Sequence, residues 1–156
     1  MAPALRLARP TDLDALVTLA GELRDFLQDP GPSDAVFRQG FARLLVDPTA
    51  AYLVAEDGAG AVIGYVALRL RDSAWHAGTE AELEDVVVAA RARGQGLGRR
   101  LGEAAIAHAR GLGCQAVGLT TNERNGPALA LYEALGLRAD RARWDGGRQL
   151  WLQRKL

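Results

Sequence analysis

The sequence predicts an α/β (α+β mixed) fold in one domain, residues 1–156, with a mostly antiparallel mixed sheet of six to seven strands, a parallel pair at its centre and about four helices. Two observations carry this prediction. Segments with apolar residues at every second position alternate with segments in which they recur at every third or fourth position. A strand, a helix and a second strand also follow one another in mid-chain, which makes those two strands parallel neighbours.

The first half of the chain supplies two helices and an antiparallel pair of strands. The expected elements are a short strand at 5–7, helices from Thr11 or Asp12 to about Gln28 and from Ser33 or Asp34 to Leu45, and strands at 51–56 and 61–71. Asp57-Gly58-Ala59-Gly60 joins the last two strands as a hairpin, because these residues tolerate the positive φ of a tight turn.

The second half continues with a strand at 80–88, whose end Val86-Val87-Val88 is typical of a central strand. We expect a helix at 97–110 with Leu101, Ala105 and Ala109 on one face. The remaining expected elements are a strand at 115–121, a helix from Asn125 to Gly136 and a hairpin of strands at 138–144 and 148–155.

Composition and charge exclude several classes of protein. Apolar residues make up 49% and charged residues 24% of the chain, as in a folded globular domain. The 19 basic and 19 acidic residues cancel, so we expect neither nucleic acid nor a membrane as partner. No stretch is apolar enough to span a bilayer, and the first residues lack the apolar core of a signal peptide, so we expect a cytoplasmic protein.

Residues with metal-binding side chains are scarce. Cys114 is the one cysteine, which excludes an intrachain disulfide and a cysteine-rich metal site and agrees with a reducing compartment. No cluster of histidine, aspartate and glutamate has the spacing of a metal site. We therefore expect no bound metal.

Residues 91–100, RARGQGLGRR, place three glycines at alternate positions before a helix. The spacing does not fit the dinucleotide fingerprint, whose third glycine would fall on Arg99, and the absence of lysine excludes a P-loop. The glycines could simply ease a tight turn. A helix N-terminus with exposed amides and flanking arginines is nevertheless suited to an anion, and a pyrophosphate is the best inference.

Two motifs resemble those of a known family. Arg93-x-x-Gly96-x-Gly98, entered from Val86-Val87-Val88, looks like the acyl-CoA pyrophosphate loop of the GNAT superfamily of N-acetyltransferases. Residues 125–137, NGPALALYEALGL, are similar to the family's later motif N-x-x-A-x-x-x-Y-x-x-x-G-[F/L], and Arg-Pro-Thr at 9–11 with Asp14 also fits its start. The resemblance implies a GNAT-type fold, acetyl-CoA as cosubstrate and an amine as acceptor.

The resemblance also assigns cofactor-binding residues. Backbone groups of Val86 and Val88 would pair with pantetheine like an added strand, with one N–H polarising the acyl carbonyl. Asn125 would contact pantetheine or phosphate, or would only cap its helix. The full expected set is Val86, Val87, Val88, Arg93, Gly94, Gln95, Gly96, Leu97, Gly98, Arg99 and Asn125. Arg100 is expected to reach the cofactor phosphates as well, and Arg91 to be solvated.

Acetyl transfer to an amine needs a proton acceptor, because an ammonium has a pKa near ~10. Strict alternation in 80–88 places Glu84 on one face with Glu82, Val86 and Val88, and Asp85 on the other with Leu83 and Val87. Glu84 is the first candidate base, since its position resembles the acid pair of the polyamine and glucosamine-phosphate branches. Asp85 is the alternative, because a family-typical bulge would reverse the facing.

Tyr132 lies within a helix, where an aromatic side chain usually packs into the core. By resemblance its hydroxyl instead hydrogen-bonds the CoA sulfur and protonates the departing thiolate. Cys114 is not expected to carry an acyl group, since neither histidine lies near it in sequence. Direct transfer in a ternary complex is therefore the expected route.

The acceptor pocket of this superfamily is built from the first two helices and the loop before the acid strand, here residues 23–41 and 73–79. A small cationic amine is the favoured acceptor, because these regions combine aromatic and acidic residues, namely Phe26, Phe37, Phe41, Trp75 and His76 with Asp25, Asp29 and Asp34. Trp144 and Trp151 are assigned either to the pocket or to the interface of an expected homodimer.

Three alternatives stay open at this stage. One is an acetyltransferase acting on protein amino groups. Another is a catalytically inactive acyl-CoA-binding or regulatory module, although Glu84, Asn125 and Tyr132 are all present. The third is an arginine-cluster nucleic-acid binder, which would bind DNA or RNA in a salt-dependent way that CoA does not compete.

Overall fold

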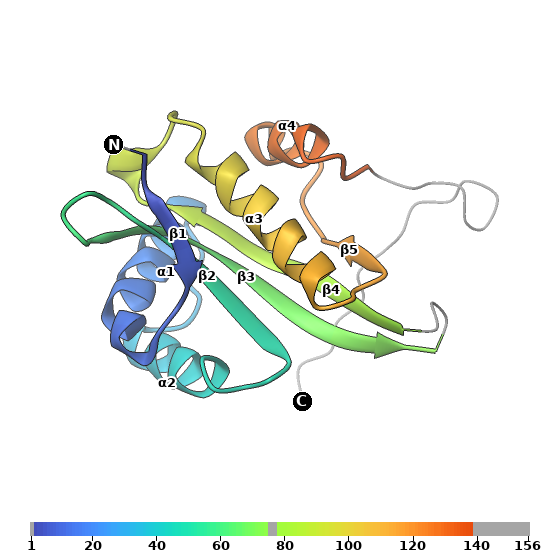
Figure 1. The fold of residues 1–156 in the computed structure, drawn as a ribbon. Coiled ribbons are helices and arrows are strands. Elements are labelled where there is room, and N and C mark those ends of the chain that lie inside the picture. Colours follow the sequence, from blue (N-terminus) through green and yellow to red (C-terminus); the bar gives the residue numbers. More distant parts are fainter. Residues whose placement is uncertain (1, 75–77, 139–156) are drawn as a thin grey trace.

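The structure is a computed structural model that describes residues 2–74 and 78–138. The principal elements are, in order, β1 (Ala4–Leu7), α1 (Leu13–Leu27), α2 (Asp34–Leu44), β2 (Ala50–Glu56), β3 (Val62–Ser73), β4 (Gly78–Val88), α3 (Leu97–Gly111), β5 (Ala116–Gly118) and α4 (Gly126–Ala134) (Figure 1). Single 3-10 turns at Pro10–Asp12 and Ala90–Ala92 precede α1 and follow β4. The four helices begin and end close to the predicted positions.

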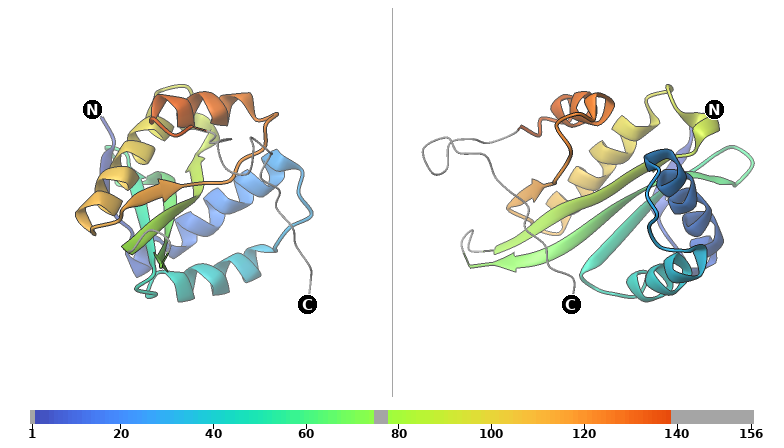
Figure 2. Two further views of the ribbon diagram at one scale, coloured as in Figure 1. Left: turned by 90° about the vertical axis from the view of Figure 1, so that its right-hand side faces the viewer. Right: turned by 180° about the vertical axis from the view of Figure 1, so that it is seen from behind.

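The described strands form one sheet in the order β1-β2-β3-β4-β5, antiparallel except for the parallel pair β4 and β5. Helices α1 and α2 cover one face of this sheet, and α3 covers the other with α4 beside it (Figures 1 and 2). The α/β fold with a mixed, mostly antiparallel sheet is confirmed.

The number of strands differs slightly from the prediction. The described sheet has five strands, whereas six to seven were expected. The expected hairpin of strands at 138–144 and 148–155 falls, apart from residue 138, outside the described residues. Strand β5 is also shorter than the predicted 115–121, because it pairs with β4 over only three residues before the chain leaves the sheet.

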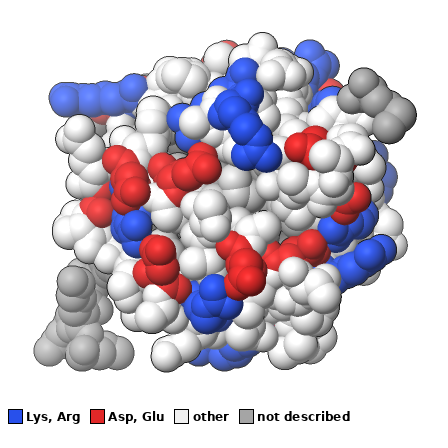
Figure 3. All heavy atoms as spheres, turned by 90° about the vertical axis from the view of Figure 1, so that its left-hand side faces the viewer, with Lys and Arg blue, Asp and Glu red and all other residues white. Residues whose placement is uncertain are grey.

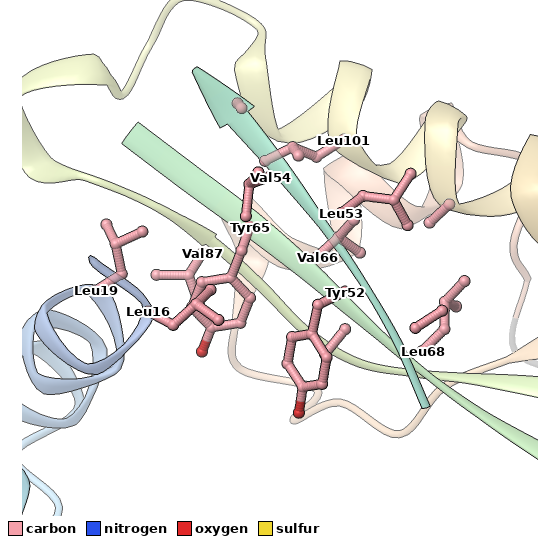
Figure 4. Close-up of a cluster of buried hydrophobic side chains, with 14 of the residues drawn as sticks. Leu16, Leu19, Tyr52, Leu53, Val54, Tyr65, Val66, Leu68, Val87 and Leu101 are labelled. Carbon is pink, nitrogen blue, oxygen red and sulfur yellow. The ribbon is translucent and has the colours of Figure 1, made fainter. Parts of the chain in front are cut away.

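The two faces of the sheet are packed by the predicted periodic helices. Leu101, Ala105 and Ala109 of α3 are all fully buried, as their spacing predicts. On the opposite face, Leu16 and Leu19 of α1 lie against Tyr65 and Val87 (Figure 4). The sheet is therefore apolar on both sides along much of its length, so a polar side chain on either face is unusual and a candidate for function.

Helices α3 and α4 approach each other closely at Gly102. A Cβ atom at this position would collide with the end of the Leu135 side chain and force it to shift, so glycine allows this close approach as it stands. The approach brings α4, and with it Tyr132, against the open end of the sheet beside β4. This packing positions one predicted catalytic residue.

Candidate active site

A β-bulge in β4 controls the direction of the predicted acids. Ala67 pairs with Asp85 and Leu68 pairs with Leu83, so Glu84 is an extra residue without a partner in β3. An extra residue reverses the alternation of side chains beyond it. Glu84 and Asp85 therefore project from the same face of the sheet, toward α1 and α2, and both line the same pocket.

The expected facing of β4 is accordingly wrong at this point. Strict alternation grouped Glu84 with Val86 and Val88, but the side chains of these two valines point toward α3, where a Cβ on Gly98 would lie 3.9 Å from each. Asp85 and Val87 do share a face, as predicted, and Glu84 joins them there. The physical reason is the extra residue, which the hydrophobic pattern of β4 does not reveal. It is the kind of bulge that the alternative assignment to Asp85 assumed.

The pocket lies between the sheet and the pair α1 and α2, with a volume of about 500 Å³. Its residues come from three sources, the two helices, the loop that joins them and the sheet. They are Ala20, Leu23, Arg24, Leu27, Asp29, Gly31, Pro32, Val36, Phe37, Gly40, Phe41, Leu44, Tyr52, Tyr65, Glu84 and Asp85. The volume is that of a site for a small molecule.

Aromatic rings make up the inner wall of this pocket. Phe41 meets Tyr52 and Tyr65 edge-on, with ring centroids 5.7 and 5.9 Å away, and stacks with Phe37 at 6.2 Å. The hydroxyl groups of Tyr52 and Tyr65 project in the same direction, on the sheet face opposite Leu101 (Figure 4). Neither hydroxyl has a hydrogen-bond partner among the described residues, and neither is sealed from the pocket.

The charges of the two acids act on the groups around them. Burial raises the pKa of the Asp85 carboxyl and also that of Glu84, where the Arg69 guanidinium only partly opposes the shift. Burial and the charges of both carboxylates raise the pKa of Tyr52 to about 12. The pKa of Tyr65 is raised by burial and by the Asp85 charge. Both tyrosines thus stay neutral and can donate or accept hydrogen bonds.

Tyr132 lies on the other side of β4 from this pocket, in α4, and its side chain is half-buried against the core. Burial raises the pKa of its hydroxyl, and the charge of Asp85 raises it further. Asp85 is therefore electrostatically coupled to both the pocket tyrosines and Tyr132. The charge of one candidate base thus acts on the hydroxyl of the predicted acid.

The edge of β4 is open beside these residues. Strand β5 pairs only with residues 80–82 of β4, so the described sheet leaves residues 84–88 without a neighbour on that side. The Ala89 amide donates to the Ile63 carbonyl at 2.9 Å, so the backbone groups of Ala89 face β3. Because backbone groups alternate in direction along a strand, the N–H and C=O groups of Val86 and Val88 face the open edge. An extended chain could add to this edge as a further strand.

The open edge leads into the predicted anion loop. Gly94 and Gly96 have φ angles of 75° and 74°, the left-handed region that glycine adopts without strain. The amides of residues 94–99 have no hydrogen-bond partner among the described residues, and the first amide of α3 to bond backward is that of Arg100, to Gly96 at 3.2 Å. These free donors at a helix N-terminus fit a pyrophosphate.

The comparison with protein families agrees with this geometry. Residues 16–137 match the model of the Acetyltransferase (GNAT) family. The chain therefore belongs to the GNAT family of acetyltransferases. The match spans the pocket helices, the acid strand, the anion loop and the helix of Tyr132.

Curated and solved relatives named as acetyltransferases extend the comparison. The aminoalkylphosphonate N-acetyltransferase of Salmonella typhimurium is 34% identical over 128 residues, which cover 82% of this chain and 80% of the relative. The mycothiol acetyltransferase of Pseudarthrobacter chlorophenolicus is 37% identical over 99 residues, 64% of this chain but only 29% of the relative. A solved acetyltransferase of Trypanosoma brucei is 28% identical, with a TM-score of 0.73 over 97% of this chain and 99% of the other.

The arginines of the GNAT loop have partners within the protein. The Arg93 Nε donates to the Val88 carbonyl at 3.0 Å, and its guanidinium lies 4.9 Å from the centre of the Phe26 ring. Arg99 pairs with Glu103 at 2.8 Å. Arg93 therefore sits on the open edge of β4 rather than over the free amides, and ties that edge to the end of α1.

Other predicted residues fall in different surroundings. Asn125 accepts a hydrogen bond from the Ala128 amide at 3.3 Å, so its capping role is confirmed. The side chains of Val87 and Leu97 are buried in the core, which leaves only their backbone for contacts with a cofactor. Arg100 donates to the Pro3 carbonyl at 2.7 Å, and Arg91 lies 3.8 Å from Asp57. Trp75, His76, Trp144 and Trp151 lie outside the described residues.

Sequence reasoning missed Tyr52, Tyr65 and Arg24 as pocket residues. The two tyrosines lie in strands of otherwise apolar residues, where they look like core. The signal available was their hydroxyl groups, because a buried tyrosine needs a partner for its O–H. Arg24 looks like a solvated helix residue, yet it lines the pocket, and its guanidinium pairs with Asp34 at 2.9 Å.

Three further features of the described residues bear on partners. No group of three or more histidine, cysteine, aspartate and glutamate residues among them is placed to hold a metal ion. None of the described helices is both long enough and apolar enough to cross a bilayer. Acidic and basic side chains are interspersed on the face seen in Figure 3.

Proposed function

We propose that this chain is a single N-acetyltransferase domain that moves an acetyl group from acetyl-CoA to a primary amine by direct transfer in a ternary complex. The observation that carries the proposal is that the open edge of β4 and the pocket under α1 and α2 meet at Glu84 and Asp85. A cosubstrate on the edge and an acceptor in the pocket would bring their reacting atoms together there.

The proposed cosubstrate site uses backbone groups. The amides of residues 94–99 bind the pyrophosphate of acetyl-CoA, with Arg93, Arg99 and Arg100 able to swing toward the phosphates. Val86 and Val88 pair with the pantetheine arm, and one of their amides donates to the acyl carbonyl. Arg93 must release the Val88 carbonyl for this pairing to be complete.

The carboxylate pair is proposed to remove the proton from the acceptor amine. An ammonium must lose a proton before its nitrogen can attack the thioester carbon, and a neighbouring carboxylate accepts it directly or through water. Glu84 is the proposed base, because its side chain is the more exposed of the two and an acceptor in the pocket can reach it. Asp85 is the competing base, and the two are separated by their effects on the pH dependence.

Tyr132 is proposed as the general acid. As the bond between the amine nitrogen and the carbonyl carbon forms, the bond from that carbon to sulfur breaks and the sulfur takes the electron pair. The Tyr132 hydroxyl gives its proton to this sulfur. Its raised pKa keeps the hydroxyl protonated at neutral pH, ready for that step.

A small cationic amine is the proposed acceptor. Glu84 and Asp85 give the pocket two negative charges next to its aromatic wall, which suits an ammonium group. The similarity to an aminoalkylphosphonate N-acetyltransferase supports a low-molecular-weight amine over a protein amino group. We also propose a cytoplasmic homodimer, which size-exclusion chromatography with light scattering would test.

Release of free thiol from acetyl-CoA across a panel of primary amines tests the proposal. We expect amine-dependent thiol release with formation of the N-acetyl product. Tight binding of CoA with no amine turned over would instead support an inactive acyl-CoA-binding module. Peptides with free N-termini and lysines belong in the panel, because their preference over small amines would identify a protein acetyltransferase.

A further inference from the structure

We infer that the acceptor is a primary amine with one charged head and an apolar, arylalkyl body. The inference rests on the proposed function and names the substrate class of the same site. It follows from the way in which polar and apolar groups divide the pocket between them.

Except for Arg24 and Asp29 on the helical side, the polar groups of the pocket lie at its sheet end. Tyr52, Glu84 and Asp85 line the same pocket from the sheet, and the charges of the two carboxylates contribute to the raised pKa of Tyr52. Tyr65 is 1% exposed, feels the charge of Asp85, and has no hydrogen-bond partner among the described residues. Two carboxylates and two unpartnered hydroxyls at one end can bind a single ammonium group.

Apart from Arg24 and Asp29 at the rim, the rest of the wall is apolar. Leu23 and Leu27 from α1 and Val36 and Phe37 from α2 line the pocket away from the acids. Phe41 connects the two regions, since it packs edge-on against both tyrosines. An aromatic ring between these side chains would gain hydrophobic and ring-to-ring contacts that a hydrated polar chain would not.

An anionic group on the acceptor would find no free cation among the described pocket residues. Arg24 is the arginine that lines the pocket, and its guanidinium already pairs with Asp25 at 3.0 Å and Asp34 at 2.9 Å and donates to the Pro32 carbonyl at 2.9 Å. A phosphonate would have to displace these partners. The described pocket residues therefore do not offer the free positive charge that an aminoalkylphosphonate would need.

A second ammonium on the acceptor would also be poorly placed. It would lie among the leucine and phenylalanine side chains unless it reached Asp29 at the rim. The Asp29 carboxylate already accepts from the Gly31 amide at 2.9 Å, and Arg24 lines the same rim. The positive charge of Arg24 offsets the attraction of Asp29 for a cation.

Initial rates with four amines test the inference. We expect kcat/KM for 2-phenylethylamine to exceed that for butylamine by about tenfold or more, in line with the area of its ring. Butylamine should in turn exceed 1,4-diaminobutane, which has the same chain length and a second charge, and aminomethylphosphonate should be the poorest. A higher kcat/KM for the diamine or the phosphonate than for 2-phenylethylamine would overturn the inference alone. Thiol release with none of the four, and with no other amine, would overturn the proposed function and this inference with it.

A pair of matched variants tests the location of the apolar body. Val36 lines the pocket and is 53% exposed, so Val36→Asp should fold normally. It should lower kcat/KM for 2-phenylethylamine about tenfold, because the new charge lies where the apolar body binds. The ratio of kcat/KM for 2-phenylethylamine to that for 1,4-diaminobutane should fall or invert, and the KM for acetyl-CoA should not change. Val46→Asp, at a 74% exposed position outside the pocket, should leave kcat/KM for both amines unchanged. Equal effects of the two variants would contradict the inference.

Discussion

The carboxylate of Asp85 raises the pKa of the Tyr132 hydroxyl, in addition to the larger effect of burial. The two residues lie in different layers of the fold, because Asp85 belongs to strand β4 and Tyr132 to helix α4. The relationship arises because β5 leaves β4 after residue 82 and opens the sheet beside the bulge. Groups on the pocket face and on the α4 side can then act on one reaction centre. In the proposed mechanism, base and acid would be supplied from opposite sides of the same strand.

Removing the hydroxyl of Tyr132 should slow the reaction without loosening the cosubstrate. Tyr132→Phe keeps the ring that packs against the core, and deletes the proton donor for the thiolate. We expect kcat to fall by about 10²-fold or more and the KM for acetyl-CoA to change less than about threefold. Steady-state kinetics at saturating amine measure both values, and an unchanged kcat would remove Tyr132 from the mechanism.

Removing the charge of Glu84 should change the pH dependence. A base acts only when ionised, so kcat/KM rises with pH through a carboxyl pKa that burial has raised above its ordinary value. In Glu84→Gln the amine must lose its proton without this help, so the rising limb should move to higher pH, toward the amine's own pKa of ~10. Glu123→Gln, at an exposed position outside the pocket, is the control, whereas Glu82 is unsuitable because its charge contributes to the raised pKa of Glu84. A profile shifted by Asp85→Asn but not by Glu84→Gln would assign the base to Asp85.

Asp85→Asn should stabilise the fold while it lowers activity. Because burial raises the folded-state pKa of Asp85, its contribution to stability is full below the unfolded value of 3.8 and is lost as the pH rises through the higher folded value. At pH 7 the native protein therefore bears the cost of ionising this carboxyl in a partly buried place or of holding it protonated, and asparagine removes that cost. We expect the melting temperature of the variant to exceed that of the wild type by a few degrees at pH 7, and the gap to close near pH 3.5. A lower melting temperature at neutral pH would show that Asp85 has a stabilising partner.

Adding a side chain in the anion loop should weaken the cosubstrate. Gly96 has a φ of 74°, where alanine is strained by about 1–2 kcal/mol, so Gly96→Ala distorts the free amides. We expect the KM for acetyl-CoA to rise about tenfold with a smaller change in kcat. Gly58→Ala is the control, because this turn glycine has open space around it and no positive φ. Equal cosubstrate KM values in the two variants would place the pyrophosphate elsewhere.

Much of the fold follows from local sequence patterns. The spacing of Leu101, Ala105 and Ala109 identified the buried face of α3, since one face of a helix repeats about every four residues. The turn Asp57-Gly58-Ala59-Gly60 located the hairpin of β2 and β3 for the same kind of reason, as its residues fit a tight turn. Both features depend on neighbours in the chain, which a single sequence displays.

The candidate site depends on pairing between distant segments, and there prediction was weaker. The bulge at Glu84 is set by how β3 pairs with β4, so alternation within β4 alone placed Glu84 on the wrong face relative to Val86. Tyr52 and Tyr65 line the pocket because α2 packs across them, and their own strands do not reveal this packing. The contact of Arg93 with Phe26 joins the loop to α1 across the fold, which no local pattern encodes.

The most direct test of direct transfer is an initial-rate measurement in which acetyl-CoA and 2-phenylethylamine, or the best amine of the panel, are varied together. Because the open edge of β4 and the acceptor pocket meet at Asp85, both substrates should have to be bound before the acetyl group moves. The double-reciprocal lines should then intersect. Parallel lines, with acetyl-enzyme detected by mass spectrometry when the amine is omitted, would show that the protein itself carries the acetyl group and would contradict the account.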